Sequence, residues 1–71
     1  MSTYSLVIKI KDNFDQHKKY LEMIKKGRIE SVLLVSFKRS IRRVLYNNYL
    51  FYVHFNRNTQ EITRICVYER I

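Results

Sequence analysis

Tyr49 to Phe55 has the sequence YLFYVHF and Ile62 to Tyr68 has the sequence ITRICVY, with a polar turn at 56–59 between them. Both runs are rich in β-branched and aromatic residues, which predicts two antiparallel strands joined as a hairpin. Because side chains alternate along a strand, one face of the hairpin is expected to be apolar. That core face would hold Tyr49, Phe51, Val53, Phe55, Ile65 and Val67. The other face would carry Leu50, Tyr52, His54, Ile62, Arg64, Cys66, Tyr68 and Arg70.

The segment before the hairpin begins with a predicted strand and a predicted helix. Residues 4–10 alternate in side-chain character and are rich in β-branched residues, as expected for a strand with one buried face. Asp12 can cap a following helix, and Gly27 provides a natural end for it. The apolar positions of this helix recur at helical spacing at Phe14, His17, Leu21 and Ile24.

Residues 29–46 fit a second helix. At 100° per residue, one broad apolar arc collects Ile29, Leu33, Leu34, Phe37, Ile41, Val44 and Leu45. The opposite side of this helix collects Lys38, Arg39, Arg42 and Arg43. The apolar run at 32–35 also fits a buried strand, so a strand at 31–37 followed by a short helix is the alternative.

These elements predict a single basic α+β domain over residues 1–71. The expected fold is a small antiparallel sheet with helices on one face, in the order β-α-α-β-β or, with the alternative strand, β-α-β-α-β-β. The longest apolar run is only Val32 to Val35, and no signal core is visible at the N-terminus. A cytoplasmic, intracellular protein is therefore expected.

The charge balance predicts a polyanionic partner. The chain has 14 Lys and Arg against 6 Asp and Glu, a net charge of +8, and residues 31–60 contain no acid. Such a field attracts phosphate polyanions at long range. We therefore expect a nucleic-acid partner, with RNA or another single strand favoured. A protein partner is the other option, and a homodimer can form through an open sheet edge.

Two groups of side chains are candidates for nucleic-acid binding. Adjacent cations on the second predicted helix can contact neighbouring phosphates, and flat rings beside guanidinium groups on the hairpin can stack with unpaired bases. The candidate residues are Lys38, Arg39, Arg42, Arg43, Tyr52, His54, Arg57, Arg64, Tyr68 and Arg70.

Signatures of cofactor and metal sites are absent from the sequence. With one glycine in the chain there is no glycine-rich phosphate loop. The lone Cys66 cannot form an internal disulfide or a cysteine zinc site, and neither His17 nor His54 has a metal-ligating neighbour at a suitable spacing. We expect no cofactor and no metal, and a binding protein rather than an enzyme.

Residues 49–70 resemble the closing hairpin of RelE/ParE-type toxins, and a strand, two helices and antiparallel strands are similar to the family's order of elements. The resemblance implies a ribosome-dependent messenger-RNA ribonuclease. In that case Arg64 would stabilise transition-state charge, Tyr68 would transfer a proton and Arg70 would bind substrate phosphate.

These features of the sequence are consistent with three functions. The first is a non-catalytic nucleic-acid-binding accessory or regulatory protein, and the second is the RelE-like ribonuclease. The third is a small inhibitor, of the kind that phages encode, which binds a host protein complex. A composition rich in Lys, Asn, Ile and Tyr is typical of an AT-rich genome.

Overall fold

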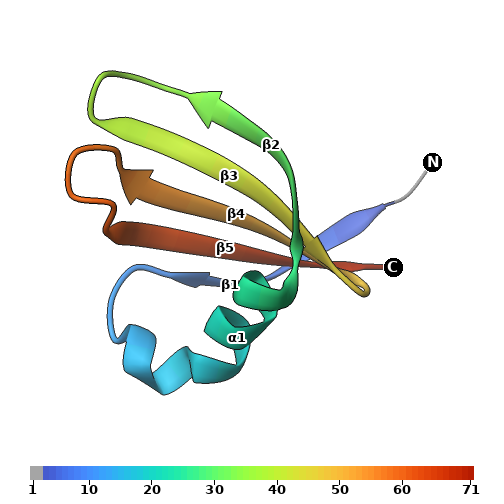
Figure 1. Cartoon of the computed structure of the whole chain (residues 1–71). Coiled ribbons are helices and arrows are strands. Elements are labelled where there is room, and N and C mark those ends of the chain that lie inside the picture. Colours follow the sequence, from blue (N-terminus) through green and yellow to red (C-terminus); the bar gives the residue numbers. More distant parts are fainter. Residues whose placement is uncertain (1–2) are drawn as a thin grey trace.

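The computed structural model describes residues 3–71, which form one antiparallel sheet and one short α-helix. The predicted α+β class is confirmed at this level. Figure 1 shows α1 lying against one side of the sheet, and the helix leads directly into β2. The elements are β1 (Tyr4–Ile10), the 3-10 helix η1 (Phe14–His17), α1 (Lys18–Lys26), β2 (Arg28–Leu34), β3 (Arg39–Tyr46), β4 (Tyr49–Asn56) and β5 (Ile62–Arg70).

The five strands are arranged in the order β1-β5-β4-β3-β2, and every neighbouring pair is antiparallel. Strands β2 to β5 follow one another as a meander, and the N-terminal strand β1 pairs with the C-terminal strand β5 (Figure 1). One edge of the sheet is thus the N-terminal strand, and the other edge is β2.

The predicted helix over 29–46 is wrong, because this segment forms β2, a turn at 35–38 and β3. The alternative order correctly placed a strand here, but its following short helix is also absent. Residues four apart share a face in both a helix and a strand, so pairs such as Ile41 and Leu45 fit either structure. Pairing decides between them: β3 forms a continuous ladder with β4 from Arg39 to Tyr46, whereas a helix would leave the edge of β4 unpaired.

The first helix is shorter than predicted at its start and ends where expected. Asn13, with a left-handed φ of 53°, precedes η1 and no side chain caps either helical segment, so the predicted cap by Asp12 is wrong. The last helical residue is Lys26, and Gly27 follows in an extended conformation with φ −73° and ψ 168°. A Cβ atom at Gly27 would lie 2.6 Å from Val44 Cγ1, so glycine is needed here for close packing against β3.

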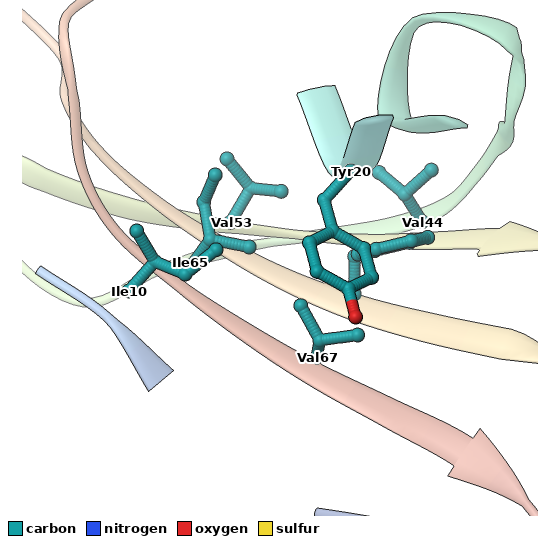
Figure 2. Packing of buried hydrophobic residues seen from close by; sticks show 7 residues of the cluster. Ile10, Tyr20, Val44, Val53, Ile65 and Val67 are labelled. Atoms are coloured by element: carbon teal, nitrogen blue, oxygen red, sulfur yellow. The ribbon is translucent and has the colours of Figure 1, made fainter. Parts of the chain in front are cut away.

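The core lies between α1 and the sheet. Figure 2 shows the Tyr20 ring pointing from the helix toward the sheet, and this ring meets the Phe51 ring edge-on at a centroid distance of 6.3 Å. Tyr20 is the one buried residue of α1. The sheet side of this cluster consists of Ile10, Val44, Phe51, Val53, Ile65 and Val67, and we call this side of the sheet the helix face.

The predicted core face of the hairpin is confirmed with one correction. Phe51, Ile65 and Val67 are fully buried, Val53 and Phe55 are nearly so, and Tyr49 packs against the cluster. A register shift between His54 and Phe55 pairs Ile62 with Phe55. This irregularity moves Ile62 onto the helix face, where strict alternation had not placed it.

Among residues 3–71 no helix is long and apolar enough to cross a membrane.

Candidate nucleic-acid interface

The sheet surface opposite α1 is the candidate site, and we call it the open face. No helix of the described chain covers it. Alternate residues of β3, β4 and β5 point to this side, because the intervening residues form the core. Three cross-strand rows result: Ile41, His54 and Arg64; Arg43, Tyr52 and Cys66; and Leu45, Leu50 and Tyr68.

The predicted binding residues are largely brought together, although not on a helix. Strand alternation sends Arg42 and Arg43 to opposite sides of the sheet, so the predicted helical stripe of cations does not form. Lys38 and Arg57 lie in turns, and Arg42 lies on the helix face. The open face carries the others, which are Arg39, Arg43, Tyr52, His54, Arg64, Tyr68 and Arg70.

Arg42 packs on the core rather than facing the open side. Its guanidinium carbon lies 4.2 Å from the centroid of the Phe55 ring, a cation–π contact that holds the side chain against the helix face. A ligand on the open face would therefore not reach Arg42. This makes Arg42 a matched control for the arginines on the other side.

A cavity of about 210 Å³ opens at His54, and its lining also includes Arg39, Ile41 and Arg64. Burial, with the positive charges of Arg64 and Arg39, lowers the pKa of His54 below its usual 6.5. At neutral pH the imidazole is therefore uncharged, with one nitrogen as donor and the other as acceptor. The side chains around this cavity include no carboxylate, so an entering anion would meet two cations and a hydrogen-bonding ring.

Two turns extend this positive region beyond the sheet. The backbone N–H of Arg57 donates to the carbonyl of Lys38 at 2.9 Å, so the turn at 35–38 lies beside the turn at 57–61 (Figure 1). The Asn56 side chain fixes the second turn by accepting the N–H groups of Asn58 and Thr59 at 2.8 and 3.2 Å. Both turn cations thus lie at the end of the sheet where β3 begins at Arg39.

Aromatic rings occur both on the open face and at its end. Tyr52 and Tyr68 are half-buried and meet edge-on, with ring centroids 5.5 Å apart. Phe37, in the turn beside Arg57, is 93% exposed. Sequence reasoning missed Phe37 as a candidate because it assigned this residue to the buried arc of a helix.

One acid interrupts the positive charge of the open face. Glu30 Oε2 lies 3.4 Å from Arg43 Nε, and Glu30 Oε1 lies 3.9 Å from the guanidinium nitrogen Nη2 of Arg28. The Arg43 Nε atom is buried and makes no hydrogen bond, so the nearby carboxylate of Glu30 is what balances the charge of the Arg43 guanidinium group. Arg43 is consequently less available to a ligand than Arg39 or Arg64. The helix predicted for 29–46 did not indicate this ion pair, which forms because β2 pairs with β3.

The described residues contain no group of three His, Cys, Asp or Glu side chains that could hold a metal ion. Cys66 is a free, buried thiol, paired across the ladder with Tyr52.

Comparison of the chain with protein-family models, with curated proteins and with solved structures gave no match.

Proposed function

We propose that the protein is a non-catalytic nucleic-acid-binding accessory protein that holds single-stranded nucleic acid, preferentially RNA, on its open face. The observation that carries this proposal is the cavity at His54, where Arg39 and Arg64 approach a neutral imidazole without a carboxylate in the lining. Phosphate oxygens match such a site, because they accept hydrogen bonds from guanidinium groups and are attracted by their charge.

The charge around the cavity favours a polyanion as the ligand over a single small anion. Strand pairing places further cations, Lys9, Arg28 and Arg70, on the open face, where Glu30 is the one acid among the strand residues. The Cα atoms of Arg64 and Arg70 are about 20 Å apart along β5 at the usual rise of an extended strand. Cations spread over this length can contact successive phosphates of one strand.

The exposed rings support a single strand rather than a duplex. Bases of a duplex are stacked on each other, whereas unpaired bases can stack on protein aromatic rings at about 1–3 kcal/mol per base. Phe37 offers nearly its whole ring, and Tyr52 and Tyr68 offer part of theirs. Between the turn cations and Tyr68, the open face carries Arg39 and Arg64 together with the rings of His54 and Tyr52.

The test measures binding of fluorescent single-stranded RNA, single-stranded DNA and duplex DNA over a salt series. For a single strand, log K should fall with log[salt] by about 0.7 for each phosphate contacted. Arg39→Ala and Arg64→Ala should each weaken binding to the RNA and reduce this slope by about 0.7.

The control for these variants is Arg42→Ala, which removes the same side chain from the other side of the sheet. Thermal melts should confirm that each variant is folded before affinities are compared. No binding at low salt, or an equal loss in Arg42→Ala and Arg64→Ala, would contradict the proposal.

A RelE-like ribonuclease is the second candidate, on the basis of the resemblance over residues 49–70. The observation in its favour is that Arg64, Tyr68 and Arg70 share the open face of β5. Under this hypothesis, expression arrests growth and causes messenger-RNA cleavage on ribosomes. Tyr68→Phe should then relieve the arrest without loss of RNA binding, whereas a binding protein should show no cleavage to lose.

A further inference from the structure

The single α-helix is too short to cover its side of the sheet. A helix of nine residues is about 14 Å long, whereas the molecule extends 34 × 28 Å in its two longer directions. Apolar side chains of the helix face remain exposed beyond it. Their exposed fractions are 54% for Ile29, 50% for Val32, 66% for Leu34 and 37% for Ile62.

A groove of about 340 Å³ marks where this coverage ends, and we call it the helix-face groove. Val44, Val53 and Phe55 of the sheet contribute to its lining. Ile24 and Gly27 border it at the end of α1, and Ile29 and Ile62 contribute further apolar surface. The groove lies on the side of the sheet opposite His54, so it is separate from the proposed nucleic-acid site.

The charged side chains that line the groove are both positive. Lys25 comes from the last turn of α1, and Arg42 comes from β3. Within residues 3–71 neither side chain takes part in an ion pair. Glu61, next to Ile62 in the chain, is an exposed turn residue outside the lining.

We propose that the helix-face groove binds the apolar side of an acidic amphipathic helix from a partner protein. Such a helix would form the second half of the layer that α1 begins, burying exposed apolar residues of β2 and β5. Its carboxylates would meet Lys25 at the end of α1 and Arg42, whose guanidinium group lies over Phe55. Complementary charge of this kind selects the partner and speeds its association.

Other occupants fit this surface less well. The α1 helix of a second copy would bring its own lysines at 18, 19, 25 and 26 toward these cations. An extended segment added to the free edge of β2 would pair with the backbone there. It would not cover Phe55, because β4 is the second strand in from that edge, about 10 Å away.

The probe for this proposal is a fluorescent 18-residue helical peptide with leucine at alternating spacings of three and four and glutamate on its other side. A second peptide carries lysine in place of every glutamate. Anisotropy titrations with the full chain should show at least tenfold tighter binding of the acidic peptide. In NMR titrations, the largest changes in backbone amide chemical shift should cluster at Ile24, Gly27, Ile29 and Ile62.

Two exposed residues of β2 provide a matched pair of variants. Ile29 lies on the helix face and Leu33 on the open face, and their exposed fractions are 54% and 53%. Ile29→Thr should weaken binding of the acidic peptide at least fivefold, and Leu33→Thr should leave it unchanged. Arg42→Glu should abolish the preference for the acidic peptide.

The outcome is distinguishable from that of the proposed function. Single-stranded RNA should neither compete with the peptide nor lose affinity in Ile29→Thr. Equal affinity for both peptides, or displacement of the acidic peptide by RNA, would overturn the groove proposal. It would also be overturned if light scattering showed a dimer that Ile29→Thr dissociates, because a second copy would then occupy the groove.

Discussion

Gly27→Ala should destabilise the protein, although alanine is ordinarily a better residue than glycine in a folded chain. The backbone at Gly27 is extended, so the change causes no backbone strain. By reducing the conformational entropy of the unfolded chain, it would by itself stabilise the protein by about 0.4–1 kcal/mol. The new Cβ, however, would lie 2.6 Å from Val44 Cγ1 and 2.8 Å from the Leu45 carbonyl oxygen. Val44 is 2% exposed and Leu45 belongs to the ladder with β4, so neither atom can move freely.

Overpacking of this kind costs about 1–3 kcal/mol, which exceeds the entropic gain. We expect a net loss of about 1–2 kcal/mol in the free energy of unfolding. For a domain of this size each kcal/mol lowers the melting temperature by about 4–8 °C. Thermal and urea unfolding followed by circular dichroism would measure both quantities.

A double-mutant cycle with Val44→Ala identifies the cause. Val44→Ala alone should destabilise by removing buried methyl groups, but the double variant should be more stable than the sum of the two losses predicts. Strict additivity, or an unchanged melting temperature in Gly27→Ala, would refute the argument that close packing requires glycine here.

Two further predictions concern the open face. Because the pKa of His54 is lowered on folding, the unfolded chain binds this proton more readily and the contribution of His54 to stability falls as the pH drops below about 6.5. A bound phosphate would raise that pKa, so RNA binding should tighten from pH 7.5 to 5.5. His54→Gln, compared with His17→Gln in urea melts and binding titrations, should remove both pH dependences; equal pH dependence in the two variants would contradict the assignment. Phe37→Ala should lower RNA affinity about fivefold or more, in line with one stacked base, and leave the melting temperature nearly unchanged because the ring is 93% exposed. A large fall in melting temperature would mean that Phe37 packs within the fold.

The shared face of the candidate residues on the hairpin could be predicted from the sequence, whereas the placement of those on β3 could not. Tyr52, His54, Arg64 and Tyr68 share one side of the sheet, as the alternating hairpin pattern indicated. Arg39 and Arg43 lie on the same face as these residues, which the predicted helix did not indicate. Both lie on β3, and cross-strand pairing turns every second residue of β3 toward the same side as His54.

Local sequence determined the parts of this protein in which one periodicity clearly dominates. The alternation in Tyr49 to Phe55 and Ile62 to Tyr68 specified the hairpin and its core face, and Gly27 marked the end of the helix. The acid-free segment at 31–60 likewise established the excess of positive charge before any fold was known.

Only the tertiary structure determined the secondary structure of residues 29–46. Their apolar positions satisfy both a helix and a strand, so local preference could not separate the two. Hydrogen bonds of β3 to β4, which leave no unpaired edge between them, made this segment a hairpin. The same pairing sent Arg42 to Phe55 and Arg39 to His54, and thereby divided one run of cations between two opposite surfaces.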